Sequence, residues 1–99
     1  VNPMWSPEFT TFPDHPISRG VKPFRVRDEW YFNMRFRDDT KGVTPILTAV
    51  PPDAVRDGPY VYPKGPYPHI QAAKGRAEHM MWAYQRPDGG RGVGFTGGH

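Results

Sequence analysis

The sequence contains no cysteine, and this absence excludes several kinds of protein at once. Without thiols the chain forms neither a disulfide framework nor a zinc–thiolate site, and it offers no cysteine nucleophile. Leucine occurs once, and Leu, Ile, Val and Phe together make only 18 of the 99 residues. The net charge of +3 is too small for an intrinsically disordered chain, and the 14 aromatic residues favour packing. We therefore expect a piece of one domain that depends on the rest of its parent domain for a sufficient core.

Recognisable targeting and membrane segments are missing as well. No apolar run approaches the roughly 18 residues of a transmembrane helix, and no signal peptide is recognisable. We therefore expect no membrane partner. The sequence does not begin with methionine, so a targeting signal would lie upstream, and the compartment is left open between cytoplasmic and periplasmic or secreted.

Several familiar functional motifs are also absent. Neither Ser6 nor Ser18 lies in the G-x-S-x-G elbow of serine hydrolases, and the glycine-rich tail matches neither the P-loop nor the dinucleotide-binding fingerprint. The pI of about 9.5 and the arginines near aromatic residues suggest nucleic acid. However, four carboxylates interrupt the basic patch: Asp28, Glu29, Asp38 and Asp39. We expect a solvated polar face here and no nucleic-acid partner.

The last part of the chain, residues 79–99, predicts a β-hairpin. Two strand-like runs, at residues 80–86 and 91–96, flank the sequence Pro87-Asp88-Gly89-Gly90. Proline presets φ for a turn, and glycine accepts the positive φ that a tight reversal requires. Alternating strand residues on both sides of such a turn are typical of a hairpin.

The second strand of this hairpin is followed by Gly97, Gly98 and His99. Because glycine has no side chain, a ligand can approach the backbone closely at Gly97 and Gly98, which are therefore candidate substrate-binding residues. In open α/β sheets the carboxyl ends of the strands are the edge at which ligands bind. His99 is thus the first candidate for a catalytic residue.

Two further strand regions are expected between residues 21 and 50. Val21–Arg37 is predicted to be a strand region with one buried face, because apolar and polar side chains alternate with a period of two over its last eight residues, 30–37. The apolar members of this alternation are Trp30, Phe32, Met34 and Phe36. Val43–Val50 is a nearly continuous apolar run, typical of a strand covered on both faces, and Pro45 requires a place at its start or on an edge.

The remaining segments are expected to be irregular. Residues 1–20 form a proline-punctuated entry, in which Asp14–Gly20 predicts a turn or a single helical turn with Asp14 as its cap. Residues 51–78 are rich in proline, glycine and tyrosine, which indicates a long excursion from the domain. Its tyrosines either offer flat faces to a sugar ring or pin the loop to the domain surface.

Candidate acid–base and metal-binding residues lie in three separate segments. Asp28 and Glu29 are adjacent carboxylates in an aromatic setting, which suits general acid–base chemistry; alternatively they cap a strand at the surface. His15 is a candidate supporting group, or it satisfies loop backbone. No compact metal motif joins the four histidines. A site assembled from His15, Glu29 and His99 would suit zinc or another divalent ion.

Three blocks of the chain resemble the trehalose-utilisation (ThuA-like) family. They are DHPISRGVKPFRVRDEWYFNMRF, VTPILTAVPPD and WAYQRPDGGRGVGFTGGH, in the order in which that family has them. The resemblance covers nearly all of the chain, and it implies a flavodoxin-like α/β domain related to class I glutamine amidotransferases. The present chain would be an incomplete C-terminal piece of that open sheet, dominated by strands and loops.

The resemblance also implies a function in carbohydrate metabolism, on trehalose, another disaccharide or a glycoside. If the protein is an enzyme, His99 is expected to act as acid–base group or metal ligand, Glu29 likewise, and His15 as their support. Trp30 and Trp82 are candidates for stacking on the sugar, although aromatic residues also serve as core. The cysteine–histidine pair of the amidotransferases has no cysteine here.

The alternative from another class is a non-catalytic module that binds carbohydrate or another protein. Such a module would keep the amidotransferase-like fold without its catalytic triad, and one scaffold can host either function. A homo-oligomer is compatible with both alternatives. Convergence of His15, Glu29 and His99 in space would favour a catalytic site, whereas scattered positions would favour a binding or structural role.

Overall fold

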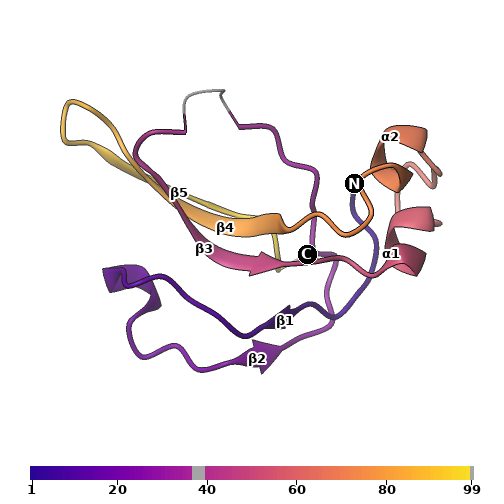
Figure 1. Ribbon diagram of the computed structural model, residues 1–99, viewed down its shortest axis with the longest axis horizontal. Coiled ribbons are helices and arrows are strands. Elements are labelled where there is room, and N and C mark those ends of the chain that lie inside the picture. The colour runs from indigo at the N-terminus through magenta and orange to yellow at the C-terminus, as the bar shows by residue number, and fades with distance from the viewer. Residues whose placement is uncertain (37–39, 99) are drawn as a thin grey trace.

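The fold consists of two antiparallel sheets with two short helices at one end (Figure 1). A computed structural model describes residues 1–36 and 40–98. The elements in chain order are β1 (Glu8–Phe9), the 3₁₀ turn η1 (Pro16–Ser18), β2 (Phe24–Arg25), β3 (Val43–Ala49), α1 (Asp53–Asp57), α2 (Pro68–Gln71), β4 (Glu78–Gln85) and β5 (Arg91–Phe95). The larger sheet has the order β3-β4-β5, and β1 pairs with β2 in the smaller one.

This architecture is a small mixed fold dominated by strands. It agrees with the strand-rich and loop-rich piece that the sequence predicts, and all strand pairings within the described residues are antiparallel. The flavodoxin-like sheet is a finer assignment that stays a prediction. Figure 1 shows the β1–β2 sheet beneath the larger sheet, and β1 contacts β3 directly.

The hairpin predicted near the C-terminus is confirmed as β4 and β5. Its turn closes where Arg86 N donates to Gly90 O at 2.7 Å and Gly89 N donates to Arg86 O at 3.0 Å. Gly89 has φ of 89°, and the Asp88 carboxylate accepts from Gly90 N at 2.8 Å. The Pro-Asp-Gly-Gly sequence thus supplies both the positive φ and the side-chain acceptor that the turn requires.

The strand predicted at Val43–Val50 is confirmed as β3, at an edge of the larger sheet, as Pro45 requires. The neighbours Ile46 and Leu47 are both buried, so both faces of the strand are covered there. The ladder with β4 changes register on each side of Leu47. Such an irregularity changes the direction in which side chains of the paired strand point, and it therefore affects the face of the sheet on which the polar side chains of β4 lie.

The long strand predicted at Val21–Arg37 is wrong. Regular pairing is limited to Phe24–Arg25, and Asp28 adds a single bridge to Trp5. The extended backbone ends at Asn33, whose φ is +62°, a left-handed value that asparagine tolerates better than most residues. The alternation still places Trp30 and Phe32 in the core, but Met34 is 42% exposed; residue 37 lies outside the described residues.

The excursion at residues 51–78 is ordered by short helices and tyrosine packing. Proline at the start of α2 has the fixed φ that suits a first helical turn. Tyr60 is buried and stacks on Tyr67 with ring centroids 5.9 Å apart, and its hydroxyl donates to the Arg56 carbonyl. Tyr60 belongs to the core cluster and Tyr67 packs against that cluster, so these two tyrosines attach the excursion to the domain, whereas Tyr62 is 80% exposed.

Aromatic side chains replace the missing leucines in the core. Trp30 packs against one aromatic ring from each sheet. Its ring centroid lies 5.1 Å from that of Phe9 in β1 and 5.6 Å from that of Phe95 in β5. Trp5 packs edge-on against Phe32 and donates its indole N–H to the Trp30 carbonyl at 3.0 Å. Large rings bury more area per residue than aliphatic side chains, which compensates for a composition poor in leucine.

Two glycines of β5 give a matched test of this packing. A Cβ at Gly94 would overlap the Trp82 ring, whereas a Cβ at Gly92 would meet nothing within 4 Å. We expect Gly94→Ala to lower the free energy of unfolding by about 1–3 kcal/mol, because Trp82 must shift. We expect Gly92→Ala to change it by no more than about 0.5 kcal/mol. Urea denaturation of both variants measures the difference, and equal effects would contradict the packing described here.

Candidate functional site

The candidate site lies where the chain leaves the carboxyl end of β5. There Thr96, Gly97 and Gly98 run alongside the segment 28–31, although about 65 to 70 residues separate the two in sequence. The Thr96 hydroxyl donates to the Tyr31 carbonyl at 2.9 Å, and Gly98 N donates to the Asp28 carboxylate at 2.6 Å. The two segments are therefore fixed to each other by hydrogen bonds at both ends of the contact.

Gly97 is required in this contact for a steric reason. A Cβ at this position would lie 2.5 Å from the Trp30 ring, so only glycine lets the backbone lie flat against the indole. The sequence predicts that a ligand approaches the backbone at Gly97, whereas the group that lies against Gly97 in the structure is Trp30 of the same chain. Trp30 itself is 3% exposed and serves the core.

A shallow cavity with a volume of about 340 Å³ opens beside this contact. It is lined by Tyr31, Met34, Phe95, Thr96, Gly97 and Gly98. Phe95 is 54% exposed and Met34 is 42% exposed, so the cavity offers apolar surface to solvent beside the threonine and the glycine backbone. A flat apolar wall with a few polar groups is the usual composition of a small-molecule site.

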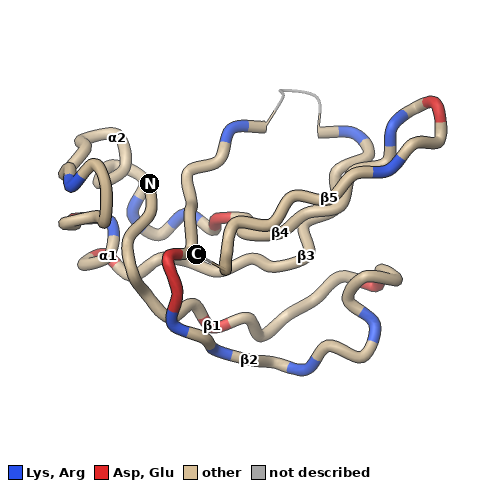
Figure 2. The backbone as a smooth tube through the Cα atoms, turned by 180° about the vertical axis from the view of Figure 1, so that it is seen from behind, with Lys and Arg blue, Asp and Glu red and all other residues tan. Residues whose placement is uncertain are grey.

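Two carboxylates stand next to this cavity in the chain, and they have different environments. Both oxygens of Asp28 accept backbone N–H groups, from Glu29 at 2.7 Å and from Gly98 at 2.6 Å. Asp28 therefore has a structural function. Glu29 is only 4% exposed, so the alternative in which both carboxylates cap a strand at the surface does not describe Glu29. Figure 2 shows the acidic pair beside the C-terminal end of the described chain.

Of the residues predicted from sequence, the structure brings Trp30 and Gly97 into contact, and Gly98 is joined by its N–H to Asp28, the neighbour of Glu29. The Glu29 side chain is buried and is not among the residues that line the cavity. His15 lies elsewhere: its Nδ1 accepts from Ile17 N at 3.1 Å and caps η1, at the far end of the β1–β2 layer from the C-terminus (Figure 1). The predicted cap, Asp14, is thus replaced by His15, whose extended backbone before proline positions its ring over the turn.

Two other predicted residues are not part of this contact. Trp82 lies against Gly94 and packs edge-on against Phe36 at 5.0 Å, within the larger sheet. His99 lies outside the described residues. Within residues 1–36 and 40–98, no group of three His, Asp or Glu side chains is placed to hold a metal ion, so the predicted divalent site stays a prediction.

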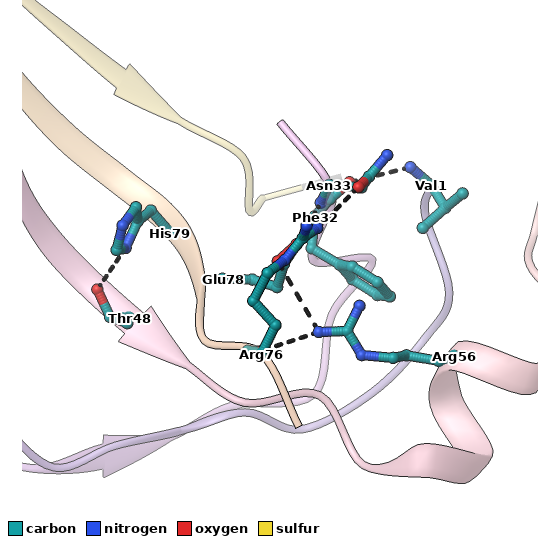
Figure 3. Close-up of polar contacts among 8 residues, drawn as sticks. All are labelled: Val1, Phe32, Asn33, Thr48, Arg56, Arg76, Glu78 and His79. Carbon is teal, nitrogen blue, oxygen red and sulfur yellow. Dashed lines mark hydrogen bonds and ion pairs between the residues drawn. The ribbon is translucent and has the colours of Figure 1, made fainter. Parts of the chain in front are cut away.

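Sequence reasoning missed a second polar centre, which surrounds the buried carboxylate of Glu78 (Figure 3). Arg76 donates to both of its oxygens, at 3.0 Å from Nε and 3.1 Å from Nη2, and Asn33 N donates to Oε1 at 3.1 Å. Arg56 is completely buried, and its Nη2 lies 3.8 Å from Oε2. No sequence signal marks this centre, because the three partners come from separate segments.

The Arg56 side chain is held by several weak contacts. Its guanidinium carbon lies 5.2 Å from the Phe32 ring centroid, and Nη2 donates to the Arg76 carbonyl at 2.8 Å. Burial lowers the pKa of Arg56 from its ordinary value, and the Glu78 carboxylate opposes that shift. The hydrogen bonds to Glu78 raise the pKa of Arg76. Because arginine side chains remain protonated in proteins, two cationic guanidiniums share this single carboxylate.

Comparison with known proteins adds no family to this description. No protein-family model, no curated protein and no solved structure matches the chain. In the part of the chain that the structure describes, no helix has the length and apolar character needed to cross a membrane.

Removal of the Glu78 charge tests the buried ionic centre. Glu78→Gln leaves Arg56 buried without its counter-charge, and we expect a loss of about 3–5 kcal/mol in the free energy of unfolding. Glu8→Gln makes the same chemical change in an ion pair whose side chains are 64% and 68% exposed. We expect that control to cost no more than about 1 kcal/mol. Chemical denaturation compares them, and a Glu78 effect as small as the control would show that the centre is not a stabilising one.

Proposed function

We propose that the chain is part of a ThuA-like domain of carbohydrate utilisation, which binds trehalose, another disaccharide or a glycoside beside the carboxyl end of β5. One observation carries this proposal: the segment 28–31 and the segment 96–98 lie side by side and are joined by hydrogen bonds. Each segment belongs to a different one of the blocks that resemble the family. Trp30 of one block and Gly97 of another are thus in contact, whereas His15 and Trp82 lie elsewhere.

The chemistry of the cavity suits a sugar ring. Tyr31 and Phe95 supply aromatic surface on which the C–H face of a pyranose can pack, and Thr96 together with the glycine backbone supplies polar groups for hydroxyls. The absence of a side chain at Gly98 permits close approach to its backbone. A neutral ligand with apolar and polar faces is the class that such a surface favours.

Glu29 is the acid–base candidate in this proposal. Its carboxyl group is almost completely buried, and carboxyl groups are common general acids and bases in enzymes. His99 follows Gly98 directly in the chain and is its proposed partner, as acid–base group or as ligand of a divalent ion such as zinc. His15 caps η1 and has no part in this step.

The rest of the parent domain completes the fold in this proposal. Within the described chain β5 pairs only with β4, and Val93 and Phe95 are 57% and 54% exposed. A flavodoxin-like sheet related to class I glutamine amidotransferases would place further elements of the parent domain over these side chains. That finer assignment rests on the resemblance.

The second candidate is a non-catalytic carbohydrate-binding or interaction module, and the environment of Asp28 favours it. Both oxygens of this carboxylate are occupied by backbone N–H groups, so one of the two adjacent acids is structural. A structural role for Glu29 as well would leave a binding surface without acid–base chemistry. Turnover and binding must therefore be measured separately.

The experiment compares Glu29→Gln with Glu8→Gln in the full-length protein that carries this chain. Isothermal titration calorimetry with trehalose, maltose and sucrose measures binding, and product analysis measures turnover. For an enzyme we expect Glu29→Gln to reduce turnover by roughly 10²–10⁴-fold with binding retained, and Glu8→Gln to behave as wild type. Binding without any turnover in the wild type would favour the non-catalytic module. Neither binding nor turnover for any of these sugars would contradict the proposal.

A further inference from the structure

A second cavity, with a volume of about 400 Å³, lies between the segment 33–36 and the start of β4. Its polar lining consists of Asn33, Arg35, His69, Arg76, Glu78 and His79. Met34 lines this cavity and also the one proposed for the sugar, so the same segment forms a wall of both. The lining is cationic and imidazole-rich, whereas the first cavity is aromatic and glycine-rich.

Arg76 is held in a fixed orientation at this cavity (Figure 3). Its Nε and Nη2 are engaged by the two oxygens of Glu78, and Nη2 also donates to the Asn33 side-chain oxygen at 2.9 Å. The left-handed backbone of Asn33 makes this possible, because it directs both the amide oxygen to Arg76 and the backbone N–H to Glu78. The Nη1 group is not used by these bonds. A guanidinium oriented in this way loses little entropy when it binds a ligand.

Among the described residues that line the cavity, positive charge exceeds negative charge. Glu78 is the one carboxylate of these described lining residues, and it is shared by Arg56 and Arg76. Arg35 is exposed and forms no ion pair with any other described residue. Both oxygens of Glu78 are already engaged, so its charge is compensated before a ligand enters.

Two imidazoles complete the lining. His79 Nδ1 is hydrogen-bonded to the Thr48 hydroxyl at 2.9 Å, and the Phe36 ring packs edge-on against the imidazole at 5.9 Å. The change of register between β3 and β4 lets His79 and Trp82 both reach Phe36, although an odd spacing would place them on opposite faces of a regular strand. His69 lies across the cavity, tilted against Tyr67 at 5.8 Å.

We propose that this cavity binds the phosphate group of a small phosphorylated ligand. Two guanidiniums and two imidazoles offer more N–H donors than a single carboxylate accepts, whereas the terminal oxygens of a phosphate monoester accept several charge-assisted hydrogen bonds at once. The site does not depend on the proposed sugar function, because its residues are separate from Glu29 and the segment 96–98. The sequence motifs for phosphate binding are absent, so the side chains alone supply the recognition.

The test titrates inorganic phosphate into the full-length protein by isothermal titration calorimetry, with wild type, Arg35→Gln and Arg19→Gln. Arg35 is exposed and unpaired among the described residues, so its replacement leaves the fold intact. Arg19 is an exposed arginine beside η1, outside this cavity, and its replacement removes the same charge. We expect saturable binding to wild type, weakened roughly tenfold or more in Arg35→Gln and changed less than about twofold in Arg19→Gln.

A second variant tests the contribution of the Arg76 guanidinium, and three competing ligands test the selectivity for phosphate. Arg76→Lys keeps the positive charge but removes the planar guanidinium and its bidentate hydrogen bonding. We therefore expect this variant to bind phosphate more weakly, with its folding verified by circular dichroism. Glucose 6-phosphate should compete with phosphate, whereas glucose and glucuronate should not. Absence of saturable phosphate binding to wild type, or equal losses in Arg35→Gln and Arg19→Gln, would overturn the proposal. Stronger competition by glucuronate would overturn the phosphate assignment. Each outcome is independent of whether trehalose binds.

Discussion

The Glu78 carboxylate is the interaction on which the arrangement of the segments depends. It is the first residue of β4, and it joins that strand to Arg56 of α1, to Arg76 of the preceding turn and to the backbone of Asn33. A buried carboxylate must be paired, and its partners come from the five-residue helix α1, from the segment just before β4 and from the irregular segment after Phe32. The excursion at residues 51–78 and the irregular segment after Phe32 are therefore ordered by the same group.

One segment, residues 31–36, contributes to both candidate sites. It is held by Phe32 in the core, by the hydrogen bond from the Thr96 hydroxyl to the Tyr31 carbonyl and by the hydrogen bond from Asn33 N to Glu78. Tyr31 and Met34 line the cavity beside the glycines after β5, whereas residues 33–36 line the cavity near the start of β4. A regular strand pairing would have occupied the same backbone groups, so hydrogen bonds to side chains take the place of a ladder in this segment.

The parts of the fold that depend on local sequence could be predicted, and those that depend on distant partners could not. The hairpin of β4 and β5 follows from its turn sequence, and β3 follows from its apolar run with Pro45 at the edge. The long strand at Val21–Arg37 was wrong, because Asn33 turns its N–H to a side chain 45 residues away rather than to a neighbouring strand. Trp30 and Gly97 were each site candidates in the sequence, but the sequence does not predict their contact with each other. The buried pairing of Arg56 also had no sequence signal, since an arginine in a short helix normally lies in solvent.

The most direct test of the central claim is a two-dimensional NMR titration of the full-length protein with trehalose, with amide and indole signals assigned. The account predicts that the largest shift changes occur at the amides of Tyr31, Gly97 and Gly98 and at the Trp30 indole, which lies against Gly97. The amide of Gly92, a β5 residue outside the cavity lining, should stay constant and serves as the internal reference. Shift changes confined to other parts of the protein, or none at saturating sugar, would contradict the claim that residues 28–31 and 96–98 form a carbohydrate site.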